Sequence, residues 1–219
     1  MEKQKNGHSF LPCFYSLFVK LYLIIKMYQY FFEYIQKLSS ELNFDTTSIQ
    51  SFLKLQKLSK GEFLFHQGDL CQAVYFNING CLRSFVIKNG KEYILFFHRE
   101  KQTVGDYESF QKQIPAYFSC QAIEDSEILI FDAQAMDFFE NAPDGQKLLR
   151  LVAEDLAFFL RDKLLSLFLD TPEERYLKLL KNEPELLQRL PQYYLASYLG
   201  IEPESLSRLK RRVYQKKIS

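Results

Sequence analysis

The chain has 219 residues and a formal net charge of +1, with 47% hydrophobic and 25% charged residues. This balance allows a packed core and argues against global disorder, and the length suits one large domain or a medium domain followed by a small one. The charge is uneven, because the only charged residues from position 208 onward are basic: Arg208, Lys210, Arg211, Arg212, Lys216 and Lys217. A basic end on a near-neutral chain indicates an anionic partner, although such a run is also typical of a solvated terminus.

Residues 1–26 differ from the rest of the chain. Phe10 to Ile25 is mostly apolar, but it contains Pro12 and Lys20 and is shorter than a membrane span. No small-residue cleavage site of a signal peptide follows it. We expect residues 1–26 to be an upstream extension with Met27 as the natural start, so no membrane partner is expected. The alternative is an apolar helix that packs on the protein or touches a membrane surface.

The cysteines and histidines form no zinc signature. They are Cys13, Cys71, Cys81 and Cys120, with His8, His66 and His98. No two cysteines have the two-residue separation of a metal-binding pair, and the histidines are scattered. We expect reduced thiols in a cytoplasmic protein, with no metal and no cofactor.

Between residues 27 and 145 the pattern changes from helical to strand-like. Tyr28–Leu42 has helical apolar spacing, and Asp45–Leu58 is predicted to be a second helix, capped by Asp45 or Thr46. Short runs rich in Phe, Tyr, Ile and Val follow, separated by turn pairs such as Asn-Gly. The predicted strands are Glu62–His66, Val74–Ile78, Leu82–Lys88, Glu92–His98, Tyr117–Ile123 and Glu127–Asp132. They predict a compact antiparallel β unit.

The helical period returns after Ala133, and Gln146–Leu169 is predicted to be one long helix. Two apolar stripes run along it. One is Leu149, Leu156, Leu160, Leu164 and Leu167, and the other is Leu148, Leu151, Phe158, Leu165 and Phe168. Such wide apolar cover fits a helix that lies between its own β unit and the equivalent helix of a second copy. Burial within one subunit is the alternative.

Residues 170–219 begin with a helix start and contain a paired-helix pattern. Thr171 is a predicted N-cap, followed by Pro172 and the capping-box residue Glu174. Further on, Pro191 is placed to begin a helix and Gly200 to end it in a left-handed turn. The predicted core positions are Leu195, Ala196 and Leu199 in this helix and Leu206, Leu209 and Val213 in a second helix that starts at Pro203. Two helices joined by a glycine turn, with a basic outer face on the second, are typical of a DNA-reading helix-turn-helix.

Over roughly residues 30–219 the chain resembles the Crp/Fnr family of bacterial transcription regulators. KGEFLFHQGD (60–69) and VYFNINGCLRSFVIKNGKEYILFF (74–97) are similar to the family's cyclic-nucleotide-binding β-roll. The long helix resembles its dimerisation helix, and residues 175–212 resemble the form found in Bacteroidetes-type members. The resemblance implies an α+β fold: an antiparallel β-roll sensor-like domain with flanking helices (27–145), a dimerisation helix (146–169) and a helix-turn-helix domain (170–219). It also implies a homodimer that binds double-stranded DNA.

The resemblance assigns DNA contacts to the second helix of the helix-turn-helix. Arg208 matches a position that contacts guanine O6 and N7, Glu204 one that accepts from cytosine N4, and Ser205 lies beside them. The expected phosphate contacts are Lys210, Arg211 and Arg212. The family often has an arginine where Pro203 stands, so one expected contact is missing and the target site is expected to differ. Because the chain stops at Ser219, the β-hairpin wing that many relatives have after this helix is expected to be absent or vestigial.

The phosphate loop of the family is matched only in part. Members that bind cyclic AMP have Gly-Glu, followed about ten residues later by Arg-Ser or Arg-Thr. Here Gly105-Asp106 and Ala116-Tyr117 stand at these positions, and Lys112 is the only cationic residue from 106 to 121. A buried phosphate without its bidentate arginine loses a charge-assisted pair, so cyclic AMP is not the expected ligand.

A different small-molecule effector remains open, as does a β-roll that acts only as a dimer scaffold. The candidate ligand pocket comprises Gly105, Asp106, Tyr107 and Tyr117. The aromatic residues Tyr93, Phe97, Tyr107 and Tyr117 are nevertheless expected to be core. An iron–sulfur or haem sensor is not supported, since the clustered N-terminal cysteines of such relatives are missing.

The alternative function is a ligand-binding or interaction module that does not read DNA. The basic outer face of residues 204–212 disfavours it. An enzyme is not expected, because the sequence has no nucleophile–base set, metal cluster or catalytic phosphate loop.

Overall fold

The computed structural model describes residues 28–42, 49 and 51–218, without the side chains of 216–218. The expectations for residues 1–26 and for the caps Asp45 and Thr46 lie outside the described residues. The strands are β1 (Lys54–Leu58), β2 (Phe63–Phe65), β3 (Val74–Asn79), β4 (Leu82–Lys88), β5 (Lys91–His98), β6 (Gln102–Val104), β7 (Ser119–Ala122) and β8 (Ser126–Phe131). After a helix at 28–38, the helices are α3 (Tyr107–Lys112), α4 (Ala133–Asn141), α5 (Gly145–Leu169), α6 (Pro172–Asn182), α7 (Pro184–Arg189), α8 (Gln192–Leu199) and α9 (Pro203–Ile218).

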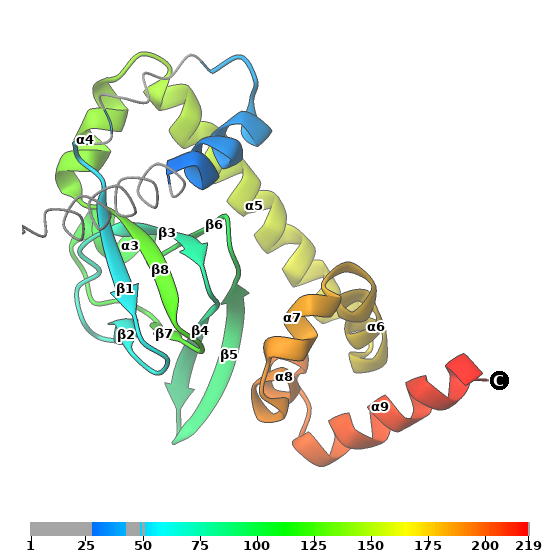
Figure 1. The fold of residues 1–219 in the computed structure, drawn as a ribbon. Coiled ribbons are helices and arrows are strands. Elements are labelled where there is room, and N and C mark those ends of the chain that lie inside the picture. The colour runs from blue at the N-terminus through cyan, green and yellow to red at the C-terminus, as the bar shows by residue number, and fades with distance from the viewer. Residues whose placement is uncertain (1–27, 43–48, 50, 219) are drawn as a thin grey trace, which may run out of the picture.

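The strands form the antiparallel β-roll that the sequence predicts. One sheet has the order β1-β8-β3-β6 and the other the order β2-β7-β4-β5 (Figure 1). Side chains from both sheets share one buried cluster, which includes Phe65, Leu82 and Ile128. The β4–β5 hairpin turns at Asn89 (φ 53°) and Gly90 (φ 74°), as its Asn-Gly pair predicts.

The prediction of a helix over Asp45–Leu58 is wrong at its C-terminal end. Residues 54–58 form strand β1, which pairs antiparallel with β8 from Lys54↔Ile130 to Leu58↔Ser126. Lysine, leucine and glutamine favour a helix, but hydrogen bonding to β8 prevails over this local preference. Strand β6 and helix α3 are not among the predicted elements, and both are short.

Helix α5 links the β-roll to the C-terminal helices. It begins in a second apolar cluster, where Leu148 packs with Phe31, Phe76 and Phe139 from the first helix, β3 and α4. It then runs beside β5, where the Phe159 ring contacts the Phe96 ring, and continues to the start of α6 (Figure 1). Helix α6 starts as predicted, since Thr171 and Glu174 form a capping box. Within the described residues, no helix has the length and hydrophobicity needed to cross a bilayer.

Candidate DNA-binding surface and phosphate loop

Helices α8 and α9 form the paired unit that the sequence predicts. Gly200 (φ 71°) ends α8, and its N–H donates to Ser197 O, while Ile201 N–H donates to Ala196 O. The predicted core positions are all buried in one cluster: Leu195, Ala196, Leu199, Leu206, Leu209 and Val213. This packing fixes which face of α9 points outward.

The outer face of α9 brings the three predicted base-contacting residues together. Glu204 and Arg208 are exposed, and Ser205 is half-buried. An Nη atom of Arg208 donates to Ser205 Oγ at 3.0 Å, which holds the guanidinium beside Ser205. Next to them is a groove of about 590 Å³ between α9 and the first turn of α6.

The three residues predicted to contact phosphate have different surroundings. Arg211 is exposed, whereas Arg212 lies 3.4 Å from Glu173 of α6. Lys210 is half-buried, and its Nζ donates to Gln192 Oε1 of α8 at 2.6 Å. Burial lowers the pKa of Lys210. Arg211 is therefore the most available of the three, and Lys210 helps to join the two helices.

In the phosphate loop, the carboxylate of Asp106 uses the backbone donors. Asp106 is buried and caps α3, accepting from Ser109 N–H at 3.1 Å, and its other oxygen accepts from Tyr117 N–H at 2.7 Å. The neighbouring Ala116 is buried and supplies no charge. The carboxylate of Asp106 thus occupies both of these N–H groups.

A cavity of about 490 Å³ lies between the β-roll and α5. Three of the four predicted pocket residues, Gly105, Asp106 and Tyr107, contribute to its lining, but Tyr117 does not. Most of the other lining residues are apolar, among them Phe97 and Phe159.

Two lining residues that are able to carry a positive charge offer little to an anion. Within the described residues, Lys101 is the single lysine or arginine of the lining, and its Nζ lies 2.6 Å from Glu33. His98 lies 2.8 Å from Ser84 Oγ, and burial lowers its pKa to about 4, so the ring is neutral at neutral pH. The cavity thus suits an uncharged molecule better than a phosphate.

The expectation that all four aromatic residues belong to the core is wrong for three of them. Phe97 is buried, but Tyr93, Tyr107 and Tyr117 are 45%, 51% and 78% exposed. Tyr107 opens the short helix α3, and Tyr117 precedes strand β7 instead of lying within it. The predicted strand Tyr117–Ile123 therefore begins two residues too early, since β7 starts at Ser119.

Comparison with known proteins agrees with this architecture. A family model described as "Cyclic nucleotide-binding domain" matches residues 55–141. The transcriptional activator protein Anr of Pseudomonas aeruginosa is 28% identical over 188 residues, which cover 78% of this chain and 75% of Anr. These matches support the resemblance to the Crp/Fnr family of transcription regulators. The chain's relatives regulate transcription, which supports the regulator hypothesis over that of an interaction module.

Solved structures share the Crp/Fnr fold at low sequence identity. FixK2 of Bradyrhizobium japonicum is 18% identical with a TM-score of 0.64, and the match covers 76% of this chain and 86% of FixK2. CLP of Xanthomonas campestris, described as a c-di-GMP-responsive global regulator, is 20% identical with a TM-score of 0.62, and the match covers 76% of this chain and 89% of CLP.

Helix α5 exposes most of its apolar surface. Leu148 at its start is buried, but Leu164 is 54% exposed and Phe168 is 80% exposed. Other apolar residues of α5 that are exposed are Leu156, Phe158, Phe159, Leu160, Leu165, Leu167 and Leu169. Within the described residues, most of the two stripes therefore stay exposed, which disfavours the alternative of burial within one subunit.

Proposed function

We propose that this protein is a cytoplasmic homodimer that reads double-stranded DNA with α9 and so regulates transcription. The observation that carries the proposal is the outer face of α9, where Glu204, Ser205 and Arg208 lie together on a helix fixed from behind by α8. Arg208 fits a guanine edge, Glu204 a cytosine amino group and Ser205 a base or a phosphate. Lys210, Arg211 and Arg212 supply phosphate contacts, with Arg211 the most available.

The dimer forms through the exposed apolar face of α5. A face this large and apolar is unusual on a monomer and typical of an interface. Because two copies of one surface pair about a two-fold axis, they present two α9 helices to one DNA duplex. The target is then an imperfect palindrome with half-sites about one helical turn apart. The protein carries out no catalysis.

The β-roll is not a cyclic AMP receptor of the usual kind. Asp106 takes the N–H groups of Ser109 and Tyr117, and the loop has no arginine to pair with a phosphate. A small-molecule effector would bind where Gly105, Asp106 and Tyr107 line the apolar cavity. Exposed Tyr117 lies outside that lining.

Titration of the full chain against a random-sequence duplex over a salt series tests the DNA interface. Each phosphate contact contributes about −0.9 to the slope of log K against log salt, so two copies of Lys210, Arg211 and Arg212 predict a slope of about −5. A slope near zero, or no binding at low salt, would contradict the proposal.

Cyclic AMP is expected to change neither the affinity of the protein for DNA nor its melting temperature. A rise of several degrees in the melting temperature at micromolar cyclic AMP would show that the loop binds it.

A further inference from the structure

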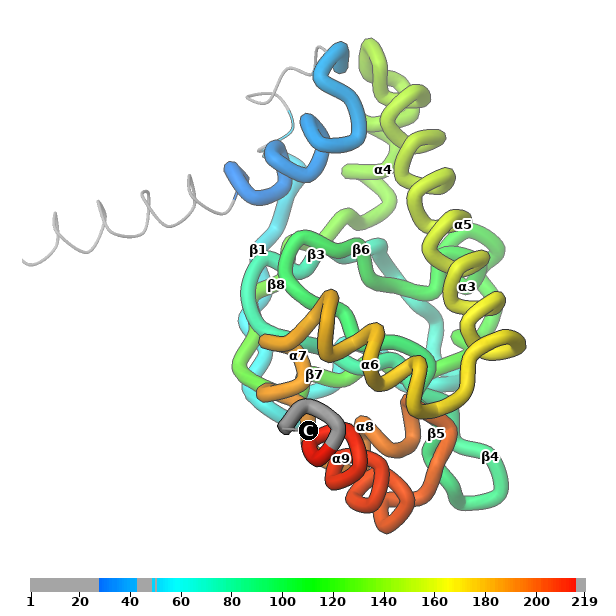
Figure 2. Tube along the Cα trace, turned by 90° about the vertical axis from the view of Figure 1, so that its right-hand side faces the viewer, coloured from blue at the N-terminus to red at the C-terminus, as the bar shows by residue number. Residues whose placement is uncertain are grey.

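The helix-turn-helix is docked on the β-roll of its own chain. Strand β5 is the last strand of its sheet, so one of its edges lacks a neighbouring strand. Helix α8 lies beside this edge (Figures 1 and 2). Ser197 Oγ of α8 accepts from Ile94 N–H at 3.1 Å and donates to Glu92 O at 3.2 Å. One side chain of α8 thus satisfies backbone groups that an edge strand normally leaves open.

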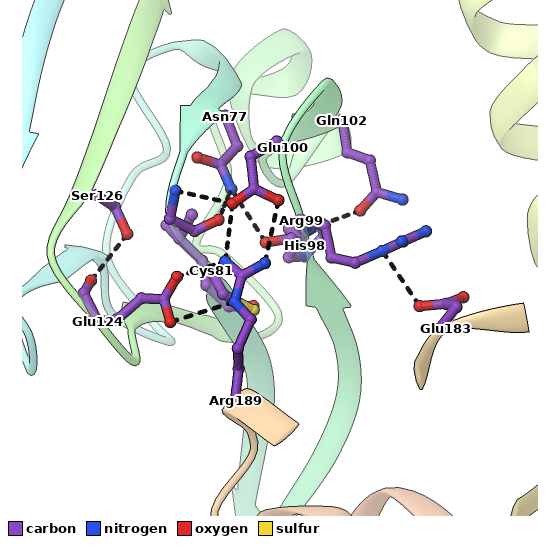
Figure 3. Close-up of polar contacts among 12 residues, drawn as sticks. Asn77, Cys81, His98, Arg99, Glu100, Gln102, Glu124, Ser126, Glu183 and Arg189 are labelled. Atoms are coloured by element: carbon purple, nitrogen blue, oxygen red, sulfur yellow. Dashed lines mark hydrogen bonds and ion pairs between the residues drawn. The ribbon is translucent and has the colours of Figure 1, made fainter. Parts of the chain in front are cut away.

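An ionic contact joins α7 to the same side of the β-roll. Arg189 donates to both carboxylate oxygens of Glu100, at 2.8 and 3.1 Å, and also forms an ion pair with Glu124 (Figure 3). Glu100 follows β5 and Glu124 follows β7, so one arginine ties two turns of the β-roll. Burial raises the pKa of Glu100, but hydrogen bonds from Arg189 and from Gly80 N–H outweigh this effect. Its pKa therefore lies below the ordinary value, and the carboxylate is charged at neutral pH.

A buried arginine of the β-roll extends the contact to α8. Arg83 is 4% exposed, and its guanidinium lies 3.9 Å from the centroid of the Phe85 ring and 4.0 Å from that of the Tyr194 ring of α8. A cation between two aromatic faces away from water is a favourable arrangement. Because Arg83 also forms an ion pair with Glu92, its charge is compensated.

Two outer ion pairs lie at the two ends of the docked surface. Arg99 Nε lies 3.1 Å from Glu183 beside α7, and Lys91 Nζ lies 2.8 Å from Glu202 just before α9. The contacts therefore reach from the start of α7 to the start of α9. Exposed pairs such as Lys91–Glu202 add little energy to the docking.

The docked surface does not use the residues that face DNA. Glu204 and Arg208 remain exposed, and none of the contacts between α7–α8 and the β-roll involves them. Docking therefore does not block the recognition face.

We propose that this docking, with Arg189 as its main ionic contact, fixes α9 relative to the β-roll and thereby sets the half-site spacing that the dimer accepts. Arg189 is a positioning residue that does not touch DNA. The inference rests on the proposed function.

The dependence of DNA affinity on half-site spacing shows whether Arg189 positions α9 or only stabilises the fold. One extra base pair between two half-sites rotates one relative to the other by about 34°, since DNA has about 10.5 base pairs per turn. A docked α9 cannot follow this rotation, whereas a released one can. The experiment measures the affinity of the full chain for its selected palindrome and for the same palindrome with one base pair inserted, in the wild type and in Arg189→Met. Lys57→Met is the matched control, because it removes the Lys57–Glu127 pair inside the β-roll.

The affinity for the selected palindrome divided by the affinity for the lengthened palindrome is expected to fall at least five-fold in Arg189→Met. The same ratio is expected to stay unchanged in Lys57→Met. Binding to random duplex at low salt stays the same in all three proteins. A ratio as high in Arg189→Met as in the wild type would overturn the inference, even if overall binding weakened. If Arg189→Met does not fold, the double variant Glu100→Gln, Glu124→Gln replaces it, because it removes the same ion pairs and keeps Arg189. The same fall in the affinity ratio is expected for it. A wild type that selects no palindrome would instead refute the proposed function.

Discussion

Leu164→Glu is expected to turn the dimer into a monomer and to lower the affinity for a palindromic site at least 100-fold. Leu164 lies on the apolar face of α5, where it is 54% exposed in the single chain and surrounded by other exposed leucine and phenylalanine residues. In a two-fold interface the substitution buries an unpaired carboxylate twice, at a cost of several kcal/mol. Sedimentation equilibrium measures the dimer, and DNA titration measures the affinity.

Leu55→Glu is the matched control for this experiment. Leu55 is 39% exposed on β1, away from α5, so the same change of side chain there leaves α5 intact. The control protein is expected to remain a dimer and to bind DNA like the wild type. A Leu164→Glu protein that sediments as a dimer and binds the palindrome normally would show that α5 is not the interface.

Arg208→Ala is expected to remove most of the preference for one base in each half-site. A bidentate arginine–guanine contact discriminates by about 1–3 kcal/mol, or about ten- to one-hundred-fold, and the dimer makes it twice. Ser205 holds the Arg208 side chain on the outer face in the structure, so little reorganisation is needed before DNA binds. Affinities for the selected site and for single-base variants of it measure the preference.

Arg211→Ala is the control that separates phosphate contact from base reading. Its exposed side chain is proposed to neutralise a phosphate, so its loss weakens binding to all sequences alike and reduces the salt slope by about one per subunit. If Arg208→Ala also weakened all sequences equally, Arg208 would be a phosphate contact, and the base-reading assignment would be wrong.

Local signals account for the parts of the fold that the sequence predicts well. The capping box at Thr171, the left-handed turn at Gly200 and the Asn-Gly hairpin at residues 89–90 depend on residues close together in the chain. The apolar period of α9 likewise identifies its core face, and thereby places Arg208 on the outside. Each of these features was predictable because its physical cause is local.

The remaining features depend on contacts between distant residues. Strand β1 forms because β8 pairs with it from about 70 positions later in the chain, against the helical preference of its own residues. The role of Asp106 depends on Tyr117 N–H, and that of Arg189 on Glu100 and Glu124. No pattern near Arg189 in the sequence distinguishes it from an ordinary surface arginine. The docking of the helix-turn-helix was therefore not predictable from periodicity or motifs.

Selection of bound duplexes from a random-sequence pool, followed by sequencing, tests most directly whether α9 reads DNA in a two-fold dimer. The wild-type chain is expected to enrich an imperfect palindrome whose half-sites lie about one helical turn apart and contain the guanine that Arg208 contacts. A pool that stays random after several rounds, with binding that fades steeply as salt rises, would contradict the account, because it would reduce the interaction to phosphate attraction alone.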